Sequence, residues 1–134
     1  MADPSVARRF ARFVTDLALE DVPAPVATRA MLLVLDTIGS CLASATMDFG
    51  RAAIHAAERL GGAPESTLIG AKAKVAAANA VMANGTLAHG LDFDDTREDA
   101  IVHTGSVAVP TALAVGEALG ASGTAALEAM IVAP

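Results

Sequence analysis

Large aromatic side chains are almost absent from the sequence. Trp and Tyr do not occur and the four Phe residues make up only 3% of the chain, yet 54% of the 134 residues are hydrophobic. The core must therefore be built mainly from Ala, Val and Leu, and small side chains of this kind favour closely packed helices. A chain of this length has enough apolar material for one domain. We expect a single all-α domain over residues 1–134, with its helices arranged like a bundle.

Hydrophobic periodicity and helix-ending residues divide the chain into six predicted helices. The first is amphipathic, with Asp3 as its N-cap and Pro4 as its first helical residue. The second covers residues 26–44 and is so apolar that it should be covered on most sides, with Asp36 buried and paired with Arg29 or a backbone donor. The remaining helices are predicted at residues 51–60, 71–91, 107–119 and 124–132, with at most one short extended segment, at residues 66–69.

Two features concern the last two helices. Pro110 has no backbone N–H, so a helix over residues 107–119 should accommodate it only in its first turn, and Gly120 should end that helix. The final helix has barely two turns, and its apolar residues Leu127, Met130 and Ile131 need packing partners. We therefore expect the chain to be a truncated piece of a larger helical domain.

Charge and cysteine content exclude several classes of protein. Nine basic residues against fifteen acidic ones give a net charge of -6, which is unsuited to binding nucleic acid. Cys41 is the only cysteine, so it can form neither an intrachain disulfide nor a cysteine-based zinc site, and we expect it to be a small core residue. The N-terminus lacks the uninterrupted apolar stretch of a secretory signal. The most apolar stretch of the chain, residues 30–45, falls short of the roughly 20 apolar residues that span a bilayer. These features predict a cytoplasmic protein without membrane contact.

The residues that could carry chemistry gather in one segment, residues 84–110, which reads NGTLAHGLDFDDTREDAIVHTGSVAVP. A loop that follows a helix can bring distant side chains together. Crowded carboxylates and a nearby imidazole shift each other's pKa, so that the roles of acid and base can be divided between them. The segment therefore favours proton transfer as its chemistry.

Three other interpretations of this segment stay open. An Asp-rich loop is most often a solvated turn. His89, Asp92, Asp95 and His103 could instead bind a divalent metal ion, since imidazole and carboxylate suit several metals. The Asp-x-Asp-x-Thr pattern at residues 92–96 is also found in haloacid dehalogenase-type phosphatases, but there it must follow a buried β-strand, and the preceding AHGL does not predict one.

Four stretches resemble, in order, the N-terminal region of the MmgE/PrpD family of lyases. They are VPAPVATRAMLLVLDTIGSCLA, STLIGAKAKVAAANAVMANGTLAHGLDFDDT, HTGSVAVPTALAVGEALG and the start of the last helix. The signature of Asn-Gly, Ala-His, Asp-Phe-Asp-Asp-Thr and a later His is too long to be explained by chance. The resemblance implies a mostly helical domain with a second, smaller domain closing over the active site. It also implies dehydration, decarboxylation or epimerisation of small polycarboxylates without a metal or organic cofactor.

Carried over residue by residue, the resemblance places Asp92, Thr96 and His103 in the active site. It implies that His103 exchanges a proton on the carbon next to a substrate carboxylate. Thr96 would hydrogen-bond the substrate, and Asp92 would orient the imidazole or serve as a second acid/base. Residues expected to support the pocket are His89, Asp94, Asp95 and Ser106, with His89 taken as a hydrogen-bonded structural histidine.

The sequence departs from the family pattern in two respects. Thr104 follows His103 where family members usually have Pro, so the loop is expected to be less rigid. The lysines and the second histidine with which family members hold carboxylates would lie beyond position 134, which accounts for the scarcity of cations. The resemblance therefore implies that this piece carries only part of an active site.

The combined prediction is a cofactor-independent lyase that acts on a small di- or tricarboxylate. Dehydration of a 2-methylcitrate-like substrate is the preferred reaction, with decarboxylation or epimerisation on the same scaffold as the alternative. A non-catalytic helical interaction fragment is the alternative from another class. Family members are commonly dimers, so a homodimer is also expected.

Overall fold

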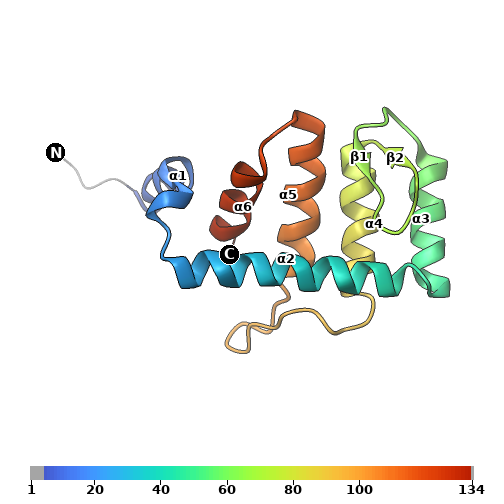
Figure 1. The fold of residues 1–134 in the computed structure, drawn as a ribbon, viewed down its shortest axis with the longest axis horizontal. Helices are drawn as coiled ribbons and strands as arrows, with labels where there is room; N and C mark the ends of the chain where they lie inside the picture. The colour runs from blue at the N-terminus through green and yellow to red at the C-terminus, as the bar shows by residue number, and fades with distance from the viewer. Residues whose placement is uncertain (1–4, 134) are drawn as a thin grey trace.

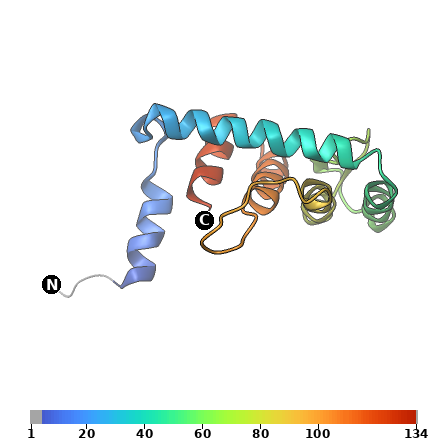
Figure 2. The same ribbon diagram turned by 90° about the horizontal axis from the view of Figure 1, so that it is seen from below.

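One long helix, α2 (Ala24–Ser44), forms the base on which the other helices stand in the computed structural model, which describes residues 5–133. Figure 1 shows α3, α4, α5 and α6 side by side across α2, and Figure 2 shows α3, α4 and α5 nearly end-on along the same side of it. The expected all-α fold is therefore confirmed. The remaining helices are α1 (Val6–Asp16), α3 (Asp48–Leu60), α4 (Ala77–His89), α5 (Gly105–Leu119) and α6 (Gly123–Val132), and a 3-10 turn η1 (Leu19–Asp21) precedes α2.

The expectation that α2 is covered on most sides is wrong. Met31, Leu32 and Leu35 are each more than half exposed, and Asp36 is exposed as well instead of being buried. The helix faces α4 and α5 with an edge of small or hydroxyl-bearing side chains, which lets the neighbouring helices approach closely. The buried residues of α2 are Thr37, Ser40, Cys41 and Ser44.

Helix α2, with 21 residues, has the length and composition of a helix that could cross a membrane, so the expectation that the apolar stretch is too short for this is wrong. Composition alone does not separate such a helix from one that packs against other protein, and α2 makes contacts with α4, α5 and α6. The expectation that the protein has no membrane contact stays a prediction.

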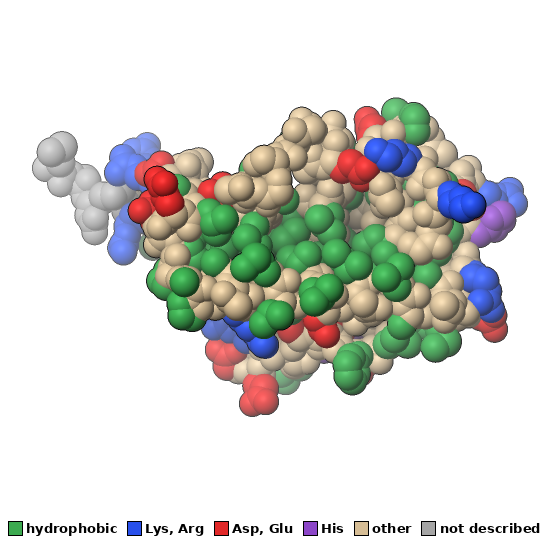
Figure 3. Space-filling model, viewed as in Figure 1, with side chains coloured by type: hydrophobic (Ala, Val, Ile, Leu, Met, Phe, Trp, Pro, Cys, Tyr) green, Lys and Arg blue, Asp and Glu red, His purple; other side chains and the backbone are tan. Residues whose placement is uncertain are grey.

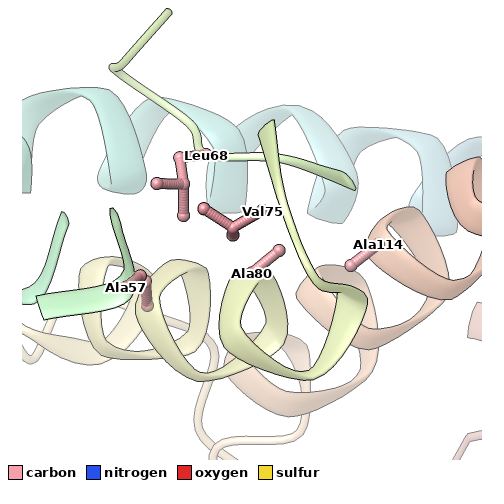
Figure 4. Packing of buried hydrophobic residues seen from close by; sticks show 6 residues of the cluster. Ala57, Leu68, Val75, Ala80 and Ala114 are labelled. Carbon is pink, nitrogen blue, oxygen red and sulfur yellow. The ribbon is translucent and has the colours of Figure 1, made fainter. Parts of the chain in front are cut away.

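The predicted start of the fourth helix, residue 71, is wrong by six residues. Helix α4 begins at Ala77, and residues 74–75 form a strand instead, β2 (Lys74–Val75), which pairs antiparallel with β1 (Ser66–Thr67). Alanine-rich sequence favours a helix here, but the tertiary contacts override that weak preference. Leu68 and Val75 from this hairpin lie over α4, with Ala57 of α3 and Ala114 of α5 on either side (Figure 4).

The Asn84–Gly85 pair in α4 has a structural explanation. The buried Asn84 side chain donates from Nδ2 to the carbonyl of Thr67 and accepts at Oδ1 from the backbone N–H of Ile69, both at 2.9 Å. Gly85 faces α5, where an added Cβ would be in van der Waals contact with the Ser106 carbonyl oxygen at 3.4 Å. Asn84 therefore holds the hairpin against α4, and Gly85 lies at the contact between α4 and α5.

Helix α5 begins at Gly105, so Pro110 is its sixth residue, and the prediction that this proline lies in the first turn is wrong. Because proline has no N–H, the Ser106 carbonyl one turn earlier loses its helical partner. The helix starts earlier because polar side chains of the preceding loop hold its first residues, as described below. Gly120 ends the helix in a left-handed conformation with φ of 64°, as predicted.

Both ends of the chain add little to the core. Helix α1 has no buried residue, and the predicted cap at Asp3 and Pro4 lies outside the described residues. The predicted last helix is confirmed as α6, which Ser122 caps by accepting from the backbone N–H of Ala125. Figure 3 shows hydrophobic side chains gathered where α5 and α6 meet α2, around a hollow whose lining includes Met31, Leu113 and Met130.

Cys41 is fully buried against α4, where its thiol donates to the Asn84 carbonyl at 3.5 Å. Burial raises the pKa of this thiol to about 11. Because the thiolate is the reactive form, we expect labelling of native protein at pH 8 to be slower than labelling of unfolded protein by a factor of about 100 or more. A chromogenic disulfide reagent, used with and without urea, measures this ratio. Fast labelling of the native protein would contradict the assignment of Cys41 to the core.

Candidate active site

The predicted site residues lie at the loop that joins α4 to α5, residues 90–104, which projects from the ends of these two helices (Figure 1). The chain leaves α4 through a tight turn in which the Asp92 N–H donates to the His89 carbonyl at 2.8 Å. Asp92 adopts φ of 52°, a left-handed conformation that Asp tolerates better than most residues. This turn brings the acidic segment back toward the end of α4.

Asp94 is the buried centre of the site. Its side chain is only 1% exposed, and its two oxygens lie 3.2 and 3.1 Å from Nδ1 of His89. Nδ1 of His103 lies 3.4 Å from Asp94 Oδ1, and the two imidazole rings are 4.9 Å apart between centroids. One buried carboxylate thus lies in contact with both imidazole rings.

The Asp94 carboxyl is held in its ionised form. Burial raises its pKa, but hydrogen bonds with Ser106, with His89 and with the backbone, together with the electrostatic attraction to His89, lower the pKa by more, so that it ends below its ordinary range. Ser106 Oγ also lies 3.0 Å from the His103 carbonyl. The hydroxyl has one hydrogen, so it can serve only one of these two acceptors at a time.

The three residues predicted to be catalytic meet at His103. Thr96 Oγ1 lies 3.4 Å from Nδ1 of His103, and Asp92 Oδ1 lies 4.0 Å from Nε2. The imidazole is about one quarter exposed, whereas the Asp92 side chain is 83% exposed. His103 is therefore contacted on its Nδ1 side by residues of the loop interior and on its Nε2 side by an exposed carboxylate.

Asp95 faces α5 instead of the imidazoles. Its Oδ1 accepts from the Gly105 N–H at 2.8 Å and its Oδ2 accepts from the Thr104 hydroxyl at 3.0 Å. Any side chain at Gly105 would collide with this carboxylate. Asp95 therefore fixes the first turn of α5, where a negative charge is favoured. Thr104, in the place of the family's proline, supplies a side-chain tether that proline lacks.

A metal-binding arrangement is also present among the described residues. One side-chain atom each from His89, Asp92, Asp94 and His103 can be chosen so that all four lie within 4.8 Å of one another. The fourth member of this candidate set is Asp94, whereas the sequence pattern indicated Asp95. Imidazole and carboxylate groups suit zinc and several other divalent ions. The phosphatase interpretation of residues 92–96 is excluded, because the element that precedes them is α4 and not a strand.

A hollow of about 450 Å³ opens beside His103, within the range of ligand-binding clefts. Arg97 contributes to its wall and forms a two-point ion pair with Asp99, at 2.8 and 3.1 Å. Arg97 directly follows Thr96 but is not among the residues that the sequence pattern assigns to the site. The other lining residues include Ala100, Val102, Thr104, Val107 and Ala108.

The family model described as the MmgE/PrpD N-terminal domain matches residues 8–134. The chain therefore belongs to the MmgE/PrpD family.

The curated relatives include cis-aconitate decarboxylase of Aspergillus terreus and the same enzyme of its strain NIH 2624. Each is 25% identical to this chain over 122 residues, which cover 91% of the chain and 25% of the relative. The chain thus spans about one quarter of the length of these relatives. No solved structure is significantly similar to the chain.

Proposed function

We propose that this chain supplies the acid/base residues of a lyase that acts on a small di- or tricarboxylate. The observation that carries the proposal is His103, held between Asp94 and Asp92 at the edge of a hollow whose wall is mostly apolar apart from Arg97, Thr104 and His103 itself. Family membership and the similarity to a decarboxylase support lyase chemistry. Within this class we propose dehydration of a 2-methylcitrate-like substrate, with decarboxylation of a cis-aconitate-like substrate as the alternative.

In a dehydration, Nε2 of His103 removes the proton from the carbon next to a substrate carboxylate. The electron pair of that C–H bond forms the carbon–carbon double bond as the hydroxyl leaves the adjacent carbon. A proton from an acid, for which Asp92 is the nearest candidate, converts the leaving group to water. Asp94 stabilises the positive charge on the imidazole while it holds the substrate's proton.

In a decarboxylation the same imidazole donates a proton to the substrate instead of removing one. The bond to the departing carboxylate breaks, its electron pair moves onto the carbon skeleton, and His103 in its protonated form donates a proton to the new carbanion. In either reaction Arg97, on the wall of the hollow, would bind a substrate carboxylate in exchange for its ion pair with Asp99.

The test incubates the purified chain with 2-methylcitrate, citrate or cis-aconitate and follows both alkene absorbance and carbon dioxide release. The assay is repeated with the part of the Aspergillus terreus enzyme that follows the matched region added as a separate polypeptide. Alkene formation supports dehydration, and carbon dioxide release supports the alternative. If neither preparation converts any of the three substrates, the non-catalytic interpretation gains support.

A metal-dependent reaction is the second candidate, because His89, Asp92, Asp94 and His103 can converge on one point. Equilibrium dialysis against zinc, manganese or iron(II), followed by metal analysis, distinguishes the two candidates. One equivalent of bound metal that is lost in a His103→Ala variant would defeat the cofactor-free proposal. Conversion of substrate in the presence of a chelator would support it.

A further inference from the structure

The environment of the His103 ring determines which of its two nitrogens carries hydrogen. Two side chains face Nδ1, each at 3.4 Å: the Asp94 carboxylate and the Thr96 hydroxyl. A carboxylate in its ionised form can only accept a hydrogen bond. For this contact to be attractive in a neutral imidazole, Nδ1 must therefore be the nitrogen that carries the hydrogen.

The Thr96 hydroxyl is compatible with the same assignment. Its single hydrogen has two partners in reach, the Asp94 backbone carbonyl at 3.5 Å and Nδ1 of His103 at 3.4 Å. When the hydroxyl donates to the carbonyl, its oxygen can only accept from the imidazole, and Nδ1 is then the donor. In this arrangement two acceptors from neighbouring positions of the chain face the same ring nitrogen.

His89 shares the same carboxylate. Its Nδ1 lies within hydrogen-bond distance of both Asp94 oxygens, so the same reasoning gives its neutral ring a hydrogen on Nδ1. Asp94 itself is fixed by burial, since only 1% of its side chain is exposed. A buried, ionised carboxylate that hydrogen-bonds the His89 ring and lies 3.4 Å from Nδ1 of His103 is well placed to orient both rings.

We propose that Asp94 is the positioning residue of this site, which together with Thr96 holds His103 with hydrogen on Nδ1 and thereby leaves Nε2 as the atom that exchanges the substrate proton. This inference rests on the proposed function for its chemistry. It assigns the orienting role to Asp94 instead of Asp92, which approaches His103 from the Nε2 side at 4.0 Å. Asp92 is then free to act as the second acid/base, on the same side of the ring as the Nε2 atom that takes up the substrate proton.

The direct test is the tautomer of His103 in the metal-free chain, read from the ¹⁵N chemical shifts of its ring at pH 8, where an ordinary imidazole is neutral. Hydrogen on Nδ1 is expected for both His89 and His103. Free histidine favours hydrogen on Nε2, so this would be an inversion imposed by the protein. Hydrogen on Nε2 of His103 in the unmodified chain would overturn the proposal without any variant.

Asp94→Asn tests the cause of the inversion. The amide of Asn places an NH₂ donor where the carboxylate had one of its two acceptor oxygens, so at least one of the two rings then faces a donor at Nδ1. We expect one of the two histidines to change to the Nε2–H form, and Asp99→Asn, in the same loop but exposed, to change neither. Retention of hydrogen on Nδ1 in both rings of the Asp94→Asn variant would show that Asp94 does not set the tautomer. Thr96→Val, of similar shape, measures the contribution of the hydroxyl in the same way.

Turnover measurements distinguish a failure of this inference from a failure of the proposed function. In a preparation that converts substrate, Asp94→Asn is expected to lower kcat by between about 10-fold and 10⁴-fold with little change in KM. The upper figure is the cost of the wrong tautomer in a Ser-His-Asp triad. The His103 tautomer is measurable whether or not the chain turns over, so loss of the proposed function leaves that measurement intact. Unchanged kcat in Asp94→Asn, together with loss of activity in a His103 variant, would overturn the positioning role alone.

Discussion

Replacement of His103 by alanine is expected to reduce the turnover of a polycarboxylate substrate by about 100-fold to 10⁴-fold. The imidazole is the one titratable ring in the described structure that both lines a hollow and contacts Asp94, Asp92 and Thr96. Its loss removes the group that exchanges the proton, whereas the surrounding carboxylates and the hollow stay in place. The measurement is the initial rate of alkene or carbon dioxide formation, compared with the unmodified protein in the same preparation.

The matched control is His55→Ala. His55 is exposed on α3 and lies outside the loop of residues 90–104, so its replacement is expected to leave turnover unchanged. If His103→Ala retained full activity while His89→Ala lost it, the proton would have to be exchanged by the other ring of the Asp94 pair. Full activity in both variants would remove this loop from the chemistry altogether.

The sequence predicted the helices well because each carries its own local signals. The ends of α3 and α5 follow from Gly61 and Gly120, both of which adopt positive φ angles at the helix ends. The short extended segment predicted at residues 66–69 contains β1, whereas its partner β2 escaped prediction, since β2 is only two residues long and lies in an alanine-rich stretch that favours a helix. What makes it a hairpin is the Asn84 side chain and the contacts of Leu68 and Val75, all of which depend on distant parts of the chain.

The candidate site was predicted in composition but not in arrangement. The family signature named Asp92, Thr96 and His103, and the structure brings all three together at the imidazole. The roles of the adjacent carboxylates could not be read from the sequence, because Asp94 and Asp95 are neighbours of the same type. Only the backbone path decides that Asp94 turns inward to the two histidines while Asp95 turns to the start of α5.

The prediction that α2 is covered on most sides differs most from the structure, and the reason applies to any helix of this composition. A helix in which nearly every position is apolar gives no periodicity from which to choose the buried face. Here the buried face holds Thr37, Ser40 and Ser44 because small residues permit closer helix packing, and the larger Leu and Met side chains point outward. Hydrophobicity alone therefore identified α2 as a helix but could not orient it.

Leu87→Ala is expected to lower the free energy of unfolding by about 2–5 kcal/mol, the range for a buried leucine truncated to alanine. Leu87 is fully buried on α4, in a cluster with Cys41 and Ala88, and α4 contacts α2, α3 and α5. The cavity would lie where α2, α3 and α4 meet, so none of these helices can close it without moving away from another. Urea denaturation followed by circular dichroism measures the difference.

Leu35→Ala is the matched control, because it removes the same atoms from a side chain that is 68% exposed on α2. Its expected cost is below about 1 kcal/mol. An equal loss in the two variants would contradict the assignment of α4 as the centre of the fold and would show that the outer face of α2 is covered in solution. The result also concerns the site, since Leu87 lies two residues before His89. A cavity at Leu87 that loosens the end of α4 should weaken the contact between His89 and Asp94, and with it the positioning of His103.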